Sequence, residues 1–294
     1  MPTGNSNIWS TRFSTEMTPT RINLDDYVHS GEGANGESFF HRDDPSIMLK
    51  LYNPSTPAES AVKEFETSLK AYEAGLPVPK PGDLVTDGQR MGIRFERIPG
   101  KISFSRAVGD NPEKVEEYAR RFARLCLRLH SVHLDTTQFS NIKDIDRDLL
   151  SENPFFSEEE KIRINAFIDA SPDADTPCHG DLQFSNAVLS SDGKEYFIDL
   201  GDMAYGHPWF DLGMVLLTCI YDPEDFIMET FHMNKQTAGQ FWLYFVKEYF
   251  GEDADPAETE ALLRPYAGLK VLLIEHYAGT YFPHFHKLLD CILK

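Results

Sequence analysis

The stretch CHGDLQFSNAVL, residues 178–189, is followed ten residues later by DLGD, residues 199–202. Asp181 and Asn186 are five residues apart, and Asp199 comes after the apolar run that follows them. Short polar residues next to glycine often form only a turn. A hairpin made by the apolar run would, however, bring Asn186 and Asp199 together across its open end. The pattern therefore favours a functional loop with a second acidic residue on the strand behind it.

These residue types suit phosphoryl transfer, in which a carboxylate orients a hydroxyl and receives its proton. Asp181 would be that carboxylate. Mg²⁺ prefers hard oxygen ligands, and Asn186 and Asp199 offer one amide oxygen and one carboxylate. The spacing of Asp181 and Asn186 is that of the H-R-D-x-x-x-x-N loop, and Asp199-Leu200-Gly201 is a relative of D-F-G. The sequence thus predicts a catalytic base and a magnesium site in this segment.

The composition is that of an ordinary globular protein. The 294 residues are 41% hydrophobic and 26% charged, enough for one large domain or two smaller ones. The net charge of −19 argues against binding of nucleic acid, which needs a basic face. The N-terminus MPTGNSNIWSTRF lacks the apolar core of a signal peptide, and no apolar run reaches the ~18 residues of a membrane span. With four scattered cysteines, we expect a cytoplasmic protein with reduced thiols and neither membrane nor nucleic-acid partners. The oligomeric state is left open.

The N-terminal third is rich in strand signals. Short β-type runs bounded by turn residues occur at 21–30, 37–42 and 46–53, and a hairpin that turns at Asp87-Gly88 is expected over 83–97. A helix is predicted over 58–74, with Gly75 as its stop. Its expected apolar stripe consists of Val62, Phe65, Leu69 and Tyr72.

From about residue 112 the apolar period changes to that of a helix, and Pro112 suits a helix start. Further helices are expected near 157–170, 208–221, 236–250 and 257–280, around one small β island over 187–200. The predicted fold class is α+β and bilobal: a small β-rich N-terminal lobe, a Pro/Gly connector and a larger, mainly helical C-terminal lobe.

Two features upstream extend the pattern. GEGANG, residues 31–36, is a GxGxxG whose flanking strands make it the bend of a hairpin; it either folds over phosphates or is a flexible surface turn. Lys50 lies inside the strand IMLKLY and either snorkels at the surface or reaches a phosphate. Glu64 or Glu66, on the next helix, would orient that lysine.

Several of these segments resemble the aminoglycoside phosphotransferase and choline kinase family, which has a protein-kinase-like fold. The resemblance is carried by CHGDLQFSNAVL, by YFIDLGDMAYGHPWFDLG and by the helix-to-connector passage EFETSLKAYEAGLPVPKP. It covers roughly residues 25–215, and the position of GLPVP favours Glu64 over Glu66. It implies a nucleotide-binding N-terminal lobe at 1–97, a linker at 98–104 and a catalytic and acceptor-binding lobe at 105–294.

The resemblance also implies ATP and Mg²⁺ as cofactors and gives roles to single residues. ATP would place its adenine against the 95–100 linker, and its phosphates under the glycine hairpin and against Lys50. Asp181 would be the base, Asp211 a structural carboxylate that ties the catalytic loop to the next helix, and His179 a loop brace. The implied nucleotide-binding residues are Gly31, Gly33, Gly36, Lys50, Glu64, Glu96 and Ile98, and the implied metal ligands are Asn186 and Asp199.

The sequence departs from protein kinases in two places. Gln183 stands where they carry a lysine, which puts direct phosphate contact from this position in doubt. GHPWFDLG follows DLG within ten residues, without an A-P-E segment, so the room for a peptide platform is missing. We therefore expect a small-molecule hydroxyl acceptor: an amino sugar, a sugar or a choline-like alcohol. A catalytically silent nucleotide-binding regulator and an atypical protein kinase are the alternatives.

We expect four of the histidines and the aromatic residues of 241–250 to have structural roles rather than catalytic or metal-binding ones. We interpret His130, His133, His284 and His286 as helix-terminal or surface residues, because a zinc site would need a fuller ligand set. The run FWLYFVKEYF, residues 241–250, is interpreted as core packing.

Overall fold

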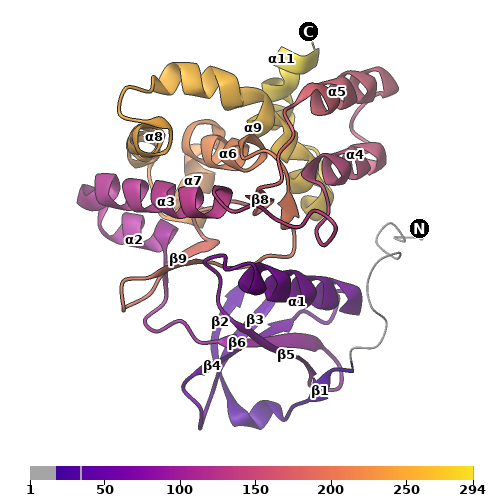
Figure 1. Ribbon diagram of the computed structural model, residues 1–294, viewed down its shortest axis with the longest axis vertical. Helices are drawn as coiled ribbons and strands as arrows, with labels where there is room; N and C mark the ends of the chain where they lie inside the picture. Colours follow the sequence, from indigo (N-terminus) through magenta and orange to yellow (C-terminus); the bar gives the residue numbers. More distant parts are fainter. Residues whose placement is uncertain (1–17, 34, 294) are drawn as a thin grey trace. The chain divides into compact units, whose positions relative to one another are not determined.

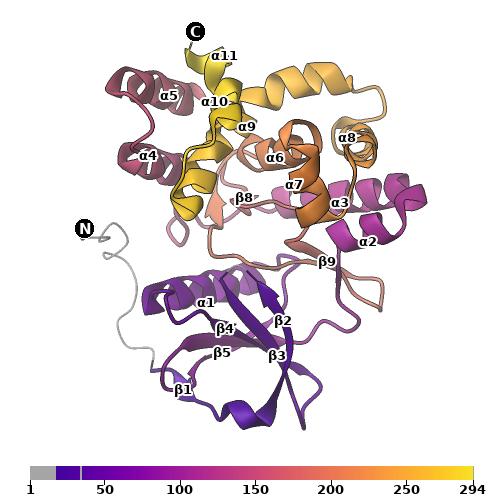
Figure 2. The ribbon, with the colours of Figure 1, turned by 180° about the vertical axis from the view of Figure 1, so that it is seen from behind.

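The computed structural model describes residues 18–33 and 35–293. The N-terminal stretch on which the signal-peptide prediction rests lies outside the described residues. The chain forms two compact units (Figures 1 and 2). The first takes the described residues up to Leu69 together with Pro79–Arg97, and the second takes Lys70–Val78 together with the described residues from Ile98 onward.

The first unit contains one twisted sheet of six strands in the order β1-β5-β6-β4-β3-β2, antiparallel except for the β1–β5 pair. The strands are β1 (Thr20–Arg21), β2 (Tyr27–Gly33), β3 (Gly36–His41), β4 (Ile47–Tyr52), β5 (Pro81–Thr86) and β6 (Met91–Glu96). The 3₁₀ turn η1 (Leu24–Asp26) leads into β2. Strands β2 and β3 pair up to Gly33 and Gly36, so GEGANG forms the tip of a hairpin as expected.

Helix α1 (Ala58–Glu73) covers one face of this sheet (Figure 1). Its Ala61 and Phe65 pack against Ile93, while Leu49 and Leu51 belong to a second apolar cluster. Alternation along β4 therefore turns Lys50 away from Leu49 and Leu51, toward the helix.

The apolar stripe predicted for α1 is partly wrong. Leu69 and Tyr72 are exposed, and the buried positions of the helix are Ala61, Glu64, Phe65, Thr67, Ser68 and Ala71. Glu64, on this buried face, pairs with Lys50. Apolarity alone therefore misplaced the buried face by one position in the last two turns.

The second unit is mainly helical. Its α-helices are α2 (Phe104–Asp110), α3 (Val115–His130), α4 (Ile142–Glu152), α5 (Glu158–Ala170), α6 (Trp209–Leu216), α7 (Glu224–Phe231), α8 (Lys235–Phe250), α9 (Pro256–Ala278), α10 (Pro283–His286) and α11 (Asp290–Leu293). The short turns are η2 (Pro112–Lys114), a π-helical turn η3 (Leu217–Tyr221) that continues α6, and η4 (Lys287–Leu289). Its short strands are β7 (Ile102–Ser103), β8 (Pro177–Cys178), β9 (Ala187–Leu189), β10 (Glu195–Phe197) and β11 (Ala204–Tyr205).

A cluster of aromatic rings forms the centre of this unit. Phe122 of α3 meets Phe184 of the candidate catalytic loop edge to face at 5.3 Å between centroids, and it also contacts Phe241 and Phe245 of α8. Phe241, Trp242 and Phe245 are buried, as predicted for the run 241–250. The loop that carries Asp181 is thus anchored through Phe184 to two long helices.

The structure confirms the α+β class and corrects several predicted elements. The run 21–30 is not one strand: Arg21 ends β1 and β2 begins at Tyr27, because Asn23 caps the turn η1 between them with its side chain. Pro112 begins the 3₁₀ turn η2 rather than helix α3. Helices α2, α4 and α7 were not predicted. Strand β10 ends at Phe197, so Asp199 follows the strand instead of lying in it. None of the helices in the described part of the chain combines the length and apolarity needed to cross a membrane.

Candidate active site

In the first unit, Lys50 and Glu64 form the ion pair that the sequence suggested. Lys50 Nζ lies 2.7 Å from both carboxylate oxygens of Glu64. Tyr52, two residues further along β4, donates its hydroxyl to Glu64 Oε2 at 2.5 Å. Glu64 is buried, so the pair is held in a poorly solvated environment where charge-assisted hydrogen bonds are strong. Between Glu64 and Glu66, the structure selects Glu64.

The glycine hairpin has one position where glycine is indispensable. A Cβ on Gly36 would lie 2.3 Å from the backbone oxygen of Leu51, so a side chain there would push β3 away from β4. Gly31 and Gly33 meet no such contact within the described residues. Ser38 Oγ donates to the backbone oxygen of Gly31 across the hairpin at 3.2 Å. These contacts keep β2 and β3 close to each other and β3 close to β4.

The connector residues follow strand β6 directly. The backbone N–H of Glu96 donates to Lys80 at 2.9 Å, and that of Arg97 donates to Ser46 at 2.7 Å. The Glu96 side chain is exposed and Ile98 is buried. Glu96 is the last residue of β6 and belongs to the first unit, whereas Ile98 begins the long segment of the second.

In the second unit, Asp181 accepts hydrogen bonds from two side chains of its own loop. Gln183 Nε2 donates to Asp181 Oδ1 at 2.6 Å, and Asn186 Nδ2 donates to Asp181 Oδ2 at 3.0 Å. The amide oxygen of Asn186 therefore points away from Asp181. The backbone oxygen of Asn186 accepts from the N–H of Ile198 at 2.9 Å, which places Asp199 directly after the residue paired with Asn186.

Asp199 has an unusual backbone. Its φ of 64° is in the left-handed region, which a residue with a side chain seldom adopts. Strained positions of this kind gather at functional sites, because the surrounding structure must hold them in place. The strain turns Asp199 out of the strand direction, and the residue is exposed. A strand prediction for 196–200 missed this feature.

Negative charge accumulates around Asp181. Desolvation raises the pKa of Asp181 above its ordinary value. The hydrogen bond from Gln183 lowers this pKa, whereas the negative charges of Asp202 and Asp199 raise it further. Tyr277 of α9 donates its hydroxyl to both oxygens of Asp202 at 2.9 Å. Asp199 and Asp202 therefore lie close enough to Asp181 to disfavour its ionisation.

The backbone ahead of Asp181 is clamped by buried groups. Asp211 Oδ2 accepts from the N–H of His179 at 2.6 Å, and Asp211 Oδ1 accepts from the N–H of Gly180 at 2.9 Å. Lys270 of α9, also buried, donates its ammonium to the backbone oxygen of Gly180 at 3.0 Å. His179 Nε2 lies 3.0 Å from the backbone oxygen of Ile198, so this nitrogen carries the proton.

The buried partners of three residues escaped the sequence analysis. His130 is helix-terminal as expected but not a surface residue: it is buried, 3.2 Å from Asp211 Oδ2 and 2.8 Å from the hydroxyl of Tyr249. His286 likewise pairs with buried Glu275 at 2.9 Å. Lys270 carried no local signal, because its partner is ninety residues away in the chain.

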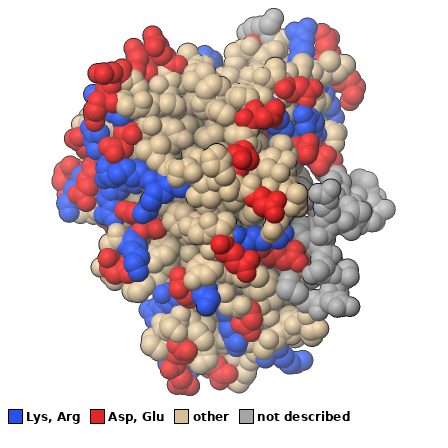
Figure 3. Space-filling model, viewed as in Figure 1, with Lys and Arg blue, Asp and Glu red and all other residues tan. Residues whose placement is uncertain are grey.

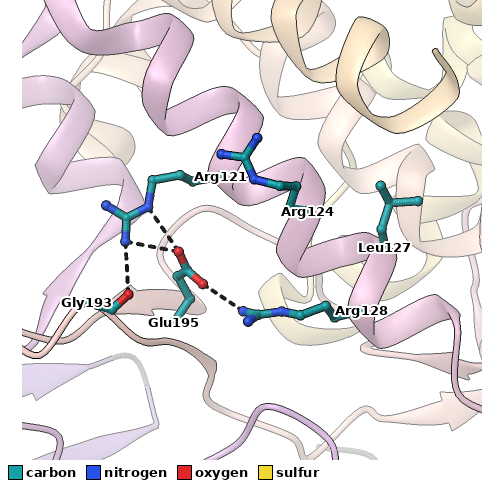
Figure 4. A pocket seen from close by; sticks show the side chains of 6 residues that line it. All are labelled: Arg121, Arg124, Leu127, Arg128, Gly193 and Glu195. Atoms are coloured by element: carbon teal, nitrogen blue, oxygen red, sulfur yellow. Dashed lines mark hydrogen bonds and ion pairs between the residues drawn. The ribbon is translucent and has the colours of Figure 1, made fainter.

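Helix α3 bears a basic surface that is separate from these residues. Lys and Arg side chains gather over α3 in the face shown in Figure 3. An open hollow of about 670 Å³ there is lined by arginines, but Arg121 and Arg128 both bind Glu195 of β10 (Figure 4). Arg124 points away from Glu195 and pairs with Glu248 of α8. The arginines of this hollow thus serve ion pairs between elements of the second unit.

Comparison with known proteins identifies the family. Residues 30–244 match the model of the phosphotransferase enzyme family APH. No curated protein sequence matches the chain. Among solved structures, a thermostable mutant of aminoglycoside phosphotransferase APH(4)-Ia in a ternary complex with ADP and hygromycin B is 13% identical, with a TM-score of 0.60, over 91% of this chain and 93% of that one.

Two further structures are similar at the level of fold. Amicoumacin kinase hAmiN, in complex with AMP-PNP, Ca²⁺ and Ami, is 15% identical with a TM-score of 0.58, over 94% of this chain and 89% of that one. A choline/ethanolamine kinase family protein from Mesorhizobium loti is 15% identical with a TM-score of 0.51, over 91% and 85% of the two chains. The fold is therefore bilobal and protein-kinase-like, as predicted.

The chain belongs to the APH phosphotransferase enzyme family, whose model covers well over half of its length. It is accordingly a kinase that acts on small molecules.

Proposed function

We propose that this phosphotransferase uses ATP and Mg²⁺ to phosphorylate a hydroxyl group of a small molecule. The observation that carries the proposal is the loop from His179 to Asn186, in which Asp181 is oriented by Gln183 and Asn186. The similar kinases whose structures contain ADP, or AMP-PNP with Ca²⁺, support nucleotide and divalent-cation binding. The proposed acceptor is an amino sugar, a sugar or a choline-like alcohol.

In this mechanism Asp181 accepts the proton of the acceptor hydroxyl as the hydroxyl oxygen attacks the γ-phosphorus. Its raised pKa favours this role, since a more basic carboxylate takes the proton more readily. Gln183 and Asn186 fix the orientation of the carboxylate, and Asp211 with Lys270 fixes the backbone before it. Positioning and charge neutralisation provide most of the rate in such reactions.

The nucleotide phosphates are assigned to residues of the first unit. Lys50, oriented by Glu64, would bind the α- and β-phosphates beneath Gly31, Gly33 and Gly36. The backbone from Glu96 to Ile98 would meet the adenine. The proposal thus gives nucleotide binding to residues 1–97, a linker role to 98–104, and catalysis and acceptor binding to 105–294.

Asn186 and Asp199 would hold Mg²⁺ through one amide oxygen and one carboxylate oxygen. The amide oxygen of Asn186 faces away from Asp181, and Asp199 is exposed, so both offer hard oxygen atoms of the kind that Mg²⁺ prefers. When bound there, Mg²⁺ would offset negative charge on the phosphates. Dependence on ATP, together with the free cysteines Cys126, Cys178 and Cys219, supports a cytoplasmic location as part of the proposal.

The test is an ADP-release assay of Asp181→Asn against the wild type over a panel of aminoglycosides, amino alcohols and hexoses. We expect the variant to lose about 10²–10⁴-fold in kcat, because the proton acceptor is gone. Thermal stabilisation by Mg-ATP should persist. Asp192→Asn, at an exposed turn in the same unit, is the matched control.

Two outcomes separate the alternatives. Wild-type turnover by Asp181→Asn would show that the base is wrongly assigned. Stabilisation by Mg-ATP without phosphorylation of any acceptor would favour a silent regulator, and transfer of label from ATP to protein would favour a protein kinase.

A further inference from the structure

A second cavity of the C-terminal unit begins beside the candidate catalytic loop. It has a volume of about 160 Å³ and is enclosed by residues of α6, the turn η3, α7, α9 and α10. Gln183 is one of its lining residues and also donates to Asp181 Oδ1 at 2.6 Å. The cavity is therefore one side chain away from the proposed base, at the place where an acceptor would have to lie.

The walls of this cavity are mostly apolar, and its polar lining residues are Gln183, Thr218, Asp222 and His284. Phe231 and Phe285 are buried in its lining, and Phe226 is an exposed aromatic residue of the same lining. Asp222 is the one carboxylate among the lining residues; it ends the turn η3 and is only 4% exposed. An apolar cavity that contains a single carboxylate recognises a different chemistry from one lined by many hydrogen-bonding groups.

Asp222 lacks the partner that a buried carboxylate needs. Its Oδ1 is buried and has no hydrogen-bond partner among the described residues. The nearby Lys235 directs its ammonium to the backbone oxygens of Ile220 and Asp222, at 2.6 and 2.8 Å. Burial raises the pKa of Asp222 to about 7, with the charge of Lys235 acting in the opposite direction. A buried, unpaired carboxylate is strongly unfavourable, so the site is complementary to a ligand cation.

The volume of the cavity and the chemistry of its walls restrict which cations it can bind. An apolar cavity of about 150 Å³ holds a group the size of benzene, so a single compact group fits and a multi-ring aminoglycoside does not. A sugar ring would bring hydroxyls that lose their hydrogen bonds to water against phenylalanine walls. An ammonium that carries small apolar substituents instead satisfies Asp222 and packs against aromatic faces.

We infer that the acceptor is an amino alcohol, with its apolar-substituted ammonium in the cavity against Asp222 and its hydroxyl directed past Gln183 to Asp181. The inference rests on the proposed phosphotransferase function and selects among its acceptor classes. The hydroxyl oxygen forms a bond to the γ-phosphorus of ATP, its proton passes to Asp181, and the bond from that phosphorus to the bridging oxygen breaks to release ADP. The products are a phosphorylated amino alcohol and ADP.

The experiment compares 2-(dimethylamino)ethanol and 3-(dimethylamino)propan-1-ol with 3,3-dimethylbutan-1-ol, a neutral compound of similar shape, and with glucose and hygromycin B. We expect kcat/KM to be about 10²-fold higher for the better amino alcohol than for the neutral alcohol, because only the cation pairs with the buried carboxylate. Asp222→Asn should raise KM for the amino alcohol by about 10²-fold, leave kcat largely unchanged and abolish the preference for charge.

Two further variants keep the result interpretable. Asp225→Asn changes an exposed carboxylate of α7 and should leave the preference for charge intact. Phe226→Ala removes an exposed ring of the lining, which the fold tolerates, and should raise KM for the amino alcohol without lowering stabilisation by Mg-ATP. Equal KM values for wild type and Asp222→Asn, or equal turnover of the neutral and cationic alcohols, would overturn the inference.

Calorimetric titration with the same amino alcohols separates this inference from the proposed function. Binding that Asp222→Asn abolishes, without ADP release, would support the cavity assignment and contradict the phosphotransferase mechanism. Turnover of glucose or hygromycin B alone, with no binding of amino alcohols, would contradict the cavity assignment and leave the mechanism standing.

Discussion

Asp211 Oδ1 accepts a 2.9 Å hydrogen bond from the backbone N–H of Gly180, which joins helix α6 to the residue directly before Asp181. The other oxygen of the same carboxylate accepts from the N–H of His179 at 2.6 Å and lies 3.2 Å from His130 Nε2. Burial alone would raise the pKa of Asp211. The hydrogen bond from His130 and the charges of His130, Lys270 and His179 outweigh burial and hold this pKa below its ordinary value. The carboxylate therefore stays ionised at its buried position and keeps the loop in place.

Replacement of this carboxylate should impair both stability and catalysis. In Asp211→Asn one of the two accepting oxygens becomes an NH₂ group, so one buried backbone N–H loses its acceptor. We expect a loss of about 1–3 kcal/mol in the free energy of unfolding, and a fall in kcat with little change in KM for ATP. Chemical denaturation and steady-state kinetics measure the two effects, with Asp192→Asn as the control. An unchanged kcat would show that Asp211 does not position the loop.

Gly180 offers a test of steric fit with a matched control. Its φ is +86°, and a Cβ there would lie 2.1 Å from the backbone oxygen of Asp202. Gly193 has nearly the same φ, +87°, but meets nothing within 4 Å. Gly193→Ala should cost about 1–2 kcal/mol from backbone strain alone. Gly180→Ala should cost more and should also lower kcat, because the loop must move away from Asp202.

Thermal unfolding and ADP release of both alanine variants measure this difference. Equal losses in stability with full activity in both variants would show that the contact between Gly180 and Asp202 does not fix the loop.

The Lys50–Glu64 pair predicts a graded effect on nucleotide use. Lys50→Met removes the proposed phosphate contact and should lower kcat/KM for ATP by about 10²–10³-fold. Tyr52→Phe removes only the hydroxyl that donates to Glu64, while Glu64 keeps both contacts to Lys50, so the loss should stay within about 10-fold. Titration of ATP at a fixed acceptor concentration gives both values.

Lys80→Met, at an exposed lysine of the same unit, controls for loss of one positive charge. A Lys50→Met variant with the ATP kinetics of this control would remove Lys50 from the proposed site.

Asp146 of α4 predicts how stability depends on pH. The residue is buried, its Oδ2 has no hydrogen-bond partner among the described residues, and desolvation raises its pKa to about 6, against the charges of Lys270 and Arg147. Because the folded pKa exceeds the unfolded value of 3.8, the folded state binds more protons between these values. The wild type should therefore lose stability as pH rises from about 4 to 6, by roughly 3 kcal/mol from this group.

Asp146→Asn should lack this loss, so the difference in Tm between variant and wild type should grow in favour of the variant as pH rises from 5 to 7. Asp148→Asn, at an exposed position of the same helix, should show no such trend. Parallel pH profiles of wild type and Asp146→Asn would show that Asp146 does not titrate in this range.

Much of the fold and of the candidate site was predictable because its signals are local. Strand β4 with its lysine, helix α1 after it, and the spacing from Asp181 to Asn186 all follow from short-range periodicity and turn chemistry. The class of the fold was predicted in this way and is confirmed. The local pattern left Glu64 and Glu66 open as partners of Lys50, the family resemblance favoured Glu64, and the structure pairs Lys50 with Glu64. Helices α2, α4 and α7 were missed, because short helices take much of their stability from packing rather than from their own pattern.

Supporting residues were missed for a related reason. The backbone oxygen of Gly180 is held by Lys270, and Asp211 is held by His130, eighty-one residues before it in the chain. No local pattern distinguishes such a lysine or histidine from one at the surface. The left-handed backbone of Asp199 was equally invisible, because apolar residues before it predict a strand that continues.

The sequence by itself determined the family of this protein, because residues 30–244 match a phosphotransferase family, and it predicted the spacing of Asp181, Asn186 and Asp199, because such spacing is readable in a short stretch of chain. Only the tertiary structure decided what surrounds Asp181: Gln183 against its carboxylate, Asp211 and Lys270 on the preceding backbone, and a small apolar cavity with Asp222. Apart from Gln183, these groups come from segments far from Asp181 in the chain. Burial and long-range packing, which place them together, leave no mark in any short stretch of sequence.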